Sequence, residues 1–222
     1  MANAEAEGFD PENRLLWRMS RRRLEAEVFR DSMLAVSDSL VTTVGGNLVD
    51  WWKEAEDRFD PRRGLIALAG PAADLRAYDC GRRSVYLPVS RNQLFEMFTL
   101  FDYADASSVL TRRRETTVAP QALFLMNSRH VRGPALQFAK LLLGRDTSDA
   151  DRVQVAHRRA FGRNATEIEV REALDYLAAH SEAKAQLGTD SGEARLQAWQ
   201  SYAQLLFCQN EFVYIDGSEH EV

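Results

Sequence analysis

The chain has 222 residues, and 45% of them are hydrophobic, so it is long enough to bury one substantial core as a single region. Charged residues make up 27% and the formal net charge is −5, a mild acidity that argues against nucleic acid as a default partner. No apolar run approaches the roughly 20 residues that cross a bilayer, and the first residues lack the parts of a signal peptide, so we expect no membrane insertion and no export signal.

Residues 1–43 predict one long helix. Asp10 is a candidate N-cap, Pro11 suits the first helical position, and no strong breaker follows before about Leu40. Apolar residues recur every three or four positions on one face that should be buried: Ala26, Phe29, Met33, Val36 and Leu40. The segment therefore belongs to the core.

A second face of this segment contains a carboxylate within an otherwise apolar row. The row consists of Leu24, Val28, Asp31 and Ala35. If it packs in the core, Asp31 is partly buried, and an ionised carboxylate there requires a charged partner. We therefore expect a structural ion pair between Asp31 and an arginine of the following motif. The candidates are Arg82, Arg83 and Arg91.

Residues 44–81 predict an irregular insert, because glycine and proline interrupt every short piece of it. Trp51 and Trp52 indicate that at least one turn of this insert packs on the core. A motif-bearing core, residues 82–146, follows. At its start, residues 84–89 alternate as in a strand, but Pro88 restricts them to an edge strand or an extended segment.

Three short helical segments are expected within this core. The first covers residues 92–101, and Pro120 opens the second after a cap at Thr117 or Ala119. Its apolar run 122–126 should be buried on most sides. A third, amphipathic segment follows residues 127–128, and Gly133-Pro134 should delay or kink it.

Residues 147–216 predict a helical hairpin and a last helix. The first helix, residues 149–161, has acidic residues in its first turn and Gly162 after its end. Thr166 to Glu169 match a capping box that opens the second helix. The last helix covers residues 193–209, and residues 212–215 are extended. The expected fold is mainly α, an irregular multi-helix domain with long loops. At most, residues 84–89 and 212–215 form a minimal two-stranded β element.

The residues give little support for familiar chemistry. The four histidines, at 130, 157, 180 and 220, have no partner at metal-ligand spacing, so we predict no metal site and place each at the surface or a helix end. Cys80 and Cys208 lie in no CxxC or CxxCH pattern. No nucleophile elbow, phosphate loop or dinucleotide glycine pattern occurs, so catalytic residues remain unknown and an enzyme is not favoured.

Two basic triplets are a possible phosphate-binding signal. They are residues 21–23 and 112–114. However, Arg21 and Arg23 stand four residues before Glu25 and Glu27, where ion pairs form along a helix, so no nucleic-acid partner is predicted.

Polar residues gather around the apolar segments of the motif-bearing core and form the candidate site. They are Arg83, Tyr86, Arg91, Asn92, Asp102, Asp105, Thr116, Thr117, Gln121 and Asn127. Two carboxylates near two arginines can bind a ligand or support acid–base chemistry if burial shifts their pKa values. The alternative, which we favour, is a structural network that ties an irregular loop to the core.

Four stretches in order resemble the planctomycete-specific domain of unknown function fifteen-fifty-three. They are the opening residues 13–31, the RRSVYLPVSRN motif at 82–92, the TTVAPQALFLMNS motif at 116–128, and the closing residues 199–216. The resemblance implies a carboxy-terminal region of a large exported protein, which follows a companion domain and often a c-type cytochrome module. It implies no established activity.

This resemblance sets the functional expectation. We favour a non-catalytic interaction or scaffold region that has an N-terminal companion domain or protein as its partner. The alternative is an enzyme or ligand-binding domain whose site the companion completes. No cofactor is expected in this chain, and a c-type haem belongs to the companion. The residues leave the location open, whereas the resemblance suggests an exported, periplasmic or cell-surface protein.

Overall fold

The computed structural model describes residues 4–45, 80–87, 89, 94–104, 111 and 113–215, and this part of the chain is mainly α-helical, as predicted. Its elements are α1 (Ala4–Phe9), β1 (Arg22–Arg23), α2 (Ala26–Val36), the 3-10 turn η3 (Ser84–Tyr86), α4 (Glu96–Leu100), α5 (Ala119–Asn127), α6 (Arg129–Leu143), α7 (Asp149–Phe161), α8 (Glu167–Gln186), α9 (Ser191–Cys208), α10 (Asn210–Val213) and β2 (Tyr214–Ile215). Most of the predicted insert 44–81, with Trp51 and Trp52, lies outside the described residues.

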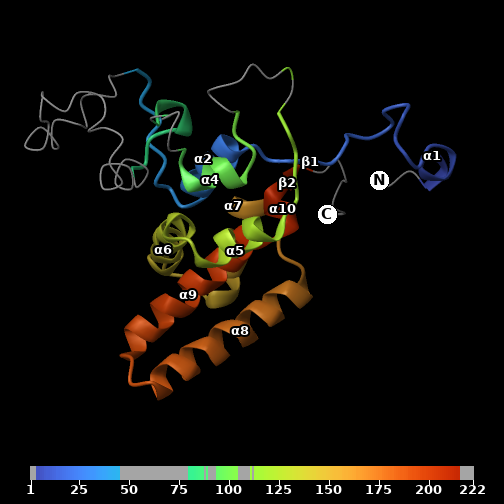
Figure 1. Ribbon diagram of the computed structural model, residues 1–222. Coiled ribbons are helices and arrows are strands. Elements are labelled where there is room, and N and C mark those ends of the chain that lie inside the picture. Colours follow the sequence, from blue (N-terminus) through green and yellow to red (C-terminus); the bar gives the residue numbers. More distant parts are fainter. Residues whose placement is uncertain are drawn as a thin grey trace, which may run out of the picture.

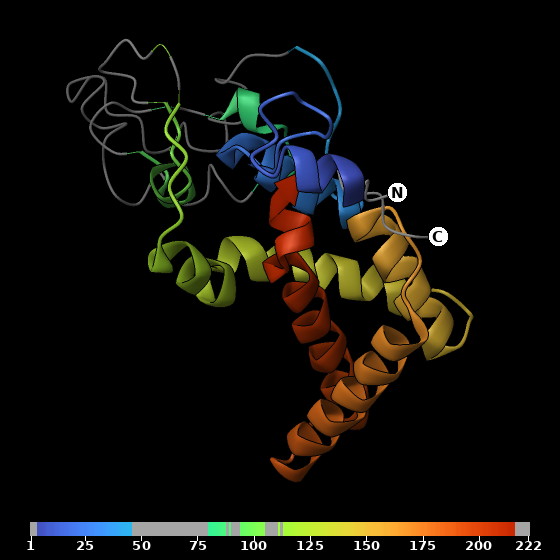
Figure 2. The same cartoon turned by 90° about the vertical axis from the view of Figure 1, so that its right-hand side faces the viewer.

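Helix α9 is the centre of the helical body, with α5, α6 and α8 packed against it (Figure 1). It buries residues on several sides, among them Trp199, Ala203 and Phe207. Phe207 stacks on Phe138 of α6, with 6.1 Å between the ring centroids. On the side away from α6, α8 and α9 form a long antiparallel hairpin whose tip projects from the body (Figures 1 and 2). The sequence predicted a hairpin of α7 with α8 and treated α9 as a separate last helix, so the pairing of α8 with α9 was not predicted.

Helix α2 joins the N-terminal region to this body. Its buried face is the predicted one, with Ala26, Phe29 and Met33 fully enclosed. The Phe29 ring stacks on Phe101 at 5.3 Å and meets Phe212 edge-on at 5.5 Å. These contacts connect α2 to the segment after α4 and to α10.

The prediction of one long helix over residues 1–43 is wrong. Residues 10–20 form turns, because the Asp10 carboxylate accepts hydrogen bonds from the backbone amides of Arg14 and Leu15. Asn13 and Leu16 also adopt positive φ angles, of 54° and 57°, which a right-handed helix excludes. Asp10 thus closes a turn instead of capping a helix.

The prediction that α2 has a second buried face is also wrong in part. Val28 and Ala35 are exposed, so the row with Asp31 lies at the edge of the core and not inside it.

The β element pairs different residues from those expected. Tyr214 and Ile215 do form a strand, but they pair antiparallel with β1, with Arg22 opposite Ile215. Residues 84–86 are instead the 3-10 turn η3, because the Ser84 amide and hydroxyl both bind Asp31 and hold this turn against α2.

Three details of the middle helices differ from the predictions. Val118 precedes α5 as its N-cap, and the Gln121 side chain accepts a hydrogen bond from its amide. The run 122–126 is buried only at two positions, and Leu123 and Met126 face outward. Helix α6 runs through Pro134 without ending, since burial of residues such as Phe138 offsets the lost hydrogen bond.

The helical hairpin agrees with its sequence signals. Helix α7 has the predicted bounds, and Gly162 follows it with a left-handed φ of 77°. Thr166 and Glu169 form the capping box of α8. Among the described residues, no helix is both long enough and apolar enough to cross a membrane.

Candidate interaction site

The structure divides the predicted polar residues into two networks, and the first surrounds Asp31, the carboxylate of the predicted ion pair. Asp31 Oδ1 accepts hydrogen bonds from the Ser84 amide at 2.8 Å and from the Ser84 hydroxyl at 2.7 Å. Arg83 Nε lies 3.9 Å from Asp31 Oδ2, and an Arg30 nitrogen lies 3.7 Å from Oδ1. The main partner is thus Ser84, which was not predicted, and Arg83, one of the predicted arginines, forms an ion pair at longer range. The network fastens η3 to α2.

The other arginine candidates have different positions. Arg82 lies over the Tyr86 ring, with its guanidinium carbon 4.3 Å from the centroid, and donates to the carbonyl of Gly45. Arg91 lies outside the described residues, as do Asn92 and Asp105 of the candidate site.

The second network surrounds Asp102. Its Oδ2 accepts from Arg23 at 2.8 Å and from the Thr116 amide at 2.7 Å. Burial raises the pKa of the Asp102 carboxyl, but hydrogen bonds from Thr116 and Arg23 outweigh burial and hold this pKa below its usual value. The buried Arg23 also donates to the carbonyls of Phe101 and Thr116. An ion pair so closely engaged with backbone groups braces the loop before α5.

The remaining candidates extend or leave this network. Gln121 is buried and donates to the carbonyls of Leu100 and Thr116. Thr117 contacts the Tyr214 hydroxyl at 3.2 Å, which links the loop to β2. Asn127 is exposed and donates to Leu123 within its own helix. The contacts of the described candidates thus hold the chain together, which supports the structural interpretation.

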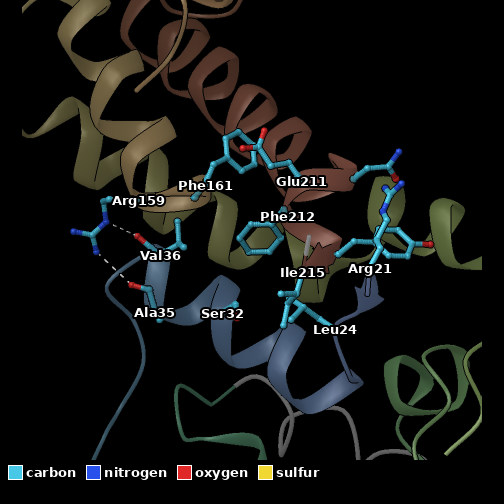
Figure 3. Close-up of a pocket in the computed structure, with 13 residues that line it drawn as sticks. Arg21, Leu24, Ser32, Ala35, Val36, Arg159, Phe161, Glu211, Phe212 and Ile215 are labelled. Carbon is cyan, nitrogen blue, oxygen red and sulfur yellow. Dashed lines mark hydrogen bonds between the residues drawn. The ribbon is translucent and has the colours of Figure 1, made fainter. Parts of the chain in front are cut away.

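A cleft of about 570 Å³ lies between α2, the end of α7, α10 and β2 (Figure 3). Its walls are largely apolar, with Phe161, Phe212 and Ile215 labelled in the close-up. Three charged side chains also line it: Glu211, Arg159, and Arg21, whose guanidinium carbon lies 4.5 Å from the Tyr214 ring centroid. A cavity of this size can hold a small ligand. None of its residues was in the predicted site, because they come from distant segments.

The sequence analysis also did not predict a buried histidine, His157, and its tyrosine partner. His157 was expected at the surface or a helix end, but it is buried and its Nε2 lies 3.1 Å from the Tyr202 hydroxyl. The signal was present, since His157 follows Val153 and Ala156 at the spacing of the buried face of α7. Burial lowers the pKa of His157 and raises that of Tyr202, so both side chains are neutral near pH 7. Among the described residues, no group of three or more potential ligands could hold a metal.

The clearest exposed apolar feature among the described residues is the N-terminal arm, which we define as residues 4–20. It leads from β1 to α1, which stands off from the helical body (Figure 1). Its large apolar side chains point outward: Phe9 is 81% exposed, Leu15 70% and Leu16 76%. Met19 is exposed as well.

The arm is held together by its own hydrogen bonds. The buried Asn13 donates to the Arg18 carbonyl at 2.8 Å and accepts from the Arg18 amide at 3.1 Å. Trp17 Nε1 donates to the Asp10 carbonyl at 2.8 Å. The turns therefore present the exposed apolar side chains on a defined backbone and not on an open coil. Large apolar side chains held outward in this way offer a surface that another molecule can cover.

The comparisons with known proteins identify a family. No curated protein and no solved structure matches the chain. A family model described as "Protein of unknown function (DUF1553)" matches residues 1–177, which include the arm, both polar networks and about the first half of α8. Because this match covers well over half of the chain, the protein belongs to the DUF1553 family of unknown function.

Proposed function

We propose that this chain is a non-catalytic interaction region whose N-terminal arm docks on a companion domain or protein. The observation that carries this proposal is the outward presentation of Phe9, Leu15 and Leu16 by a backbone that is braced internally. Burying three such side chains contributes about 1.5–3 kcal/mol each, enough for a specific contact if the partner offers apolar pockets. The polar networks support the same proposal, because their described members serve the fold.

We also propose where this region lies within a larger protein. We place it at the carboxy-terminal side of its companion, in an exported planctomycete protein, with any c-type haem in the companion. Nucleic acid is not the proposed partner. Two of the arginines of the first basic triplet contact the protein itself, since Arg23 binds Asp102 and Arg21 lies over Tyr214.

Binding to the polypeptide encoded immediately upstream of this chain tests the proposal. The double variant Leu15→Ser, Leu16→Ser should weaken binding at least about tenfold while the helical content stays unchanged, because both side chains are exposed in the free chain. The matched control is Ile168→Ser, Leu187→Ser, which removes two exposed apolar side chains of α8 and its end. Equal affinities of the two double variants would refute docking through the arm.

Ligand binding in the cleft is the second candidate function, and the volume and mixed lining of that cleft favour it. In this alternative the companion would close the open side and complete the site. Phe212→Ala, which removes a cleft-lining ring, would then abolish ligand binding. Turnover of a defined substrate by this chain alone would defeat the non-catalytic proposal.

A further inference from the structure

A proton-accepting atom is buried without a partner at the junction of α7, α8, α9 and α10. His157 Nδ1 makes no hydrogen bond, and it lies 3.9 Å from Glu169 Oε2, too far for one. The other ring nitrogen is engaged with Tyr202. A small movement of the ring would therefore convert proton uptake by His157 into a charge-assisted hydrogen bond with Glu169.

The carboxylate that faces His157 is already shared. Glu169 accepts from Arg163 through both oxygens, at 2.7 and 2.9 Å, and it closes the capping box with Thr166. The same guanidinium binds both oxygens of Glu211 on α10, each at 2.7 Å. Two carboxylates thus share one arginine, so the cluster has an excess negative charge that a proton on His157 would neutralise.

We propose that His157 is an acid-responsive switch that controls how firmly the α7–α8 turn holds α10. On protonation, the imidazolium attracts Glu169 and repels Arg163. Arg163 then loses its two hydrogen bonds to Glu169 and is repelled by the imidazolium, so its guanidinium is no longer fixed in the position from which it binds both oxygens of Glu211 on α10. Because β2 follows α10 directly and pairs with β1, loosening spreads to the strand that joins the arm to the body.

The surroundings of His157 set the pH range in which it takes up a proton. Glu169 and Glu211 raise the pKa of His157, but burial and Arg163 lower it, and the net direction is downward. Tyr202 stays protonated because burial raises its pKa. Proton uptake therefore begins below the usual range of histidine. This inference depends only on the junction and does not rest on the docking of the arm.

Hydrogen exchange on the full chain tests the switch, with intrinsic exchange rates corrected for pH. Between about pH 7.5 and about pH 5, protection of residues 210–215 should fall about tenfold or more, whereas that of α6 residues 135–142 should not. The variant His157→Gln keeps a polar side chain toward Tyr202 but cannot take up the proton, so its protection should be the same at both pH values.

Two results would overturn the inference. One is equal protection of residues 210–215 at both pH values in the unmodified chain, and the other is the same loss in His157→Gln as in the unmodified chain. If His157→Gln does not fold, Glu169→Gln decides instead, because it removes the carboxylate that the imidazolium would attract. A pH-dependent loss that persists in Glu169→Gln would also contradict the switch.

Discussion

Asp31 shows at the scale of single residues how this fold satisfies a partly buried charge. Its side chain is 20% exposed, and the two shortest contacts come from the amide and hydroxyl of one residue, Ser84. Arg83 contributes at longer range, with a side chain that is itself half exposed. Such a carboxylate is stabilised mainly by hydrogen bonds, and the nearby guanidinium groups add a screened attraction.

Asp31→Asn should therefore cost about 1–3 kcal/mol of unfolding free energy, because the amide keeps one acceptor for Ser84 but loses the charge that strengthens the bond. Urea denaturation measures this change. The matched control is Asp38→Asn, whose side chain is 77% exposed and lies 3.8 Å from Arg159, so its cost should stay below about 1 kcal/mol. If the two variants lose the same unfolding free energy, the hydrogen bonds of Asp31 contribute no more to stability than an exposed ion pair does.

At the scale of elements, the sequence predicts helices best where their ends have local signals. Helix α7 and the start of α8 agree with their predictions because Gly162 and the Thr166–Glu169 capping box act within a few residues. The prediction of one long N-terminal helix is wrong because no glycine or proline between Pro11 and α2 marks the turns that lie there. The turns depend on hydrogen bonds from the Asp10 and Asn13 side chains to the backbone, which a periodic pattern does not reveal.

Helix α6 gives a test of the opposite kind, where a local breaker is overridden by packing. Pro134→Ala should stabilise the protein by about 1–3 kcal/mol, since it restores an amide donor in the interior of a helix that is already formed. Thermal unfolding measures the gain. Pro120→Ala is the control, because Pro120 occupies the first turn of α5, where the missing amide is not needed. If Pro120→Ala stabilises the protein as much as Pro134→Ala does, the missing amide donor at residue 134 has no special cost in α6.

At the scale of the whole molecule, stability should fall in acid in two steps. The folded-state pKa of His157 lies below its ordinary value of 6.5, so the unfolded chain takes up this proton first and stability declines as pH falls below about 6.5. Hydrogen bonds from Arg163 lower the pKa of Glu169 from 4.5 to about 2, so its contribution is present above about pH 4.5 and is lost as pH falls toward 2.

Urea midpoints measured from neutral pH to about pH 3 separate the two steps. His157→Gln should flatten the upper step, and Glu169→Gln should flatten the lower one. An upper step that survives in His157→Gln would assign it to another group.

The candidate site was predictable only as a set of polar residues. The sequence brought Asp102, Thr116 and Gln121 together correctly as neighbours, because they flank the same loop and helix. It could not separate them from Arg83, which lies near Asp31, nor find Ser84 as the partner of the Asp31 carboxylate, since both depend on how α2 lies against η3. The exposed side of the arm was likewise hidden by its helix-like spacing.

The arm is the central claim at this scale, and radical footprinting of its side chains tests that claim most directly. In the free chain, Phe9, Leu15, Leu16 and Met19 should be oxidised readily, as should Ile168 and Leu187. When the upstream polypeptide is joined to the chain, the four arm side chains should become protected while Ile168 and Leu187 remain reactive. Arm side chains that stay as reactive in the joined protein as in the free chain would contradict the account.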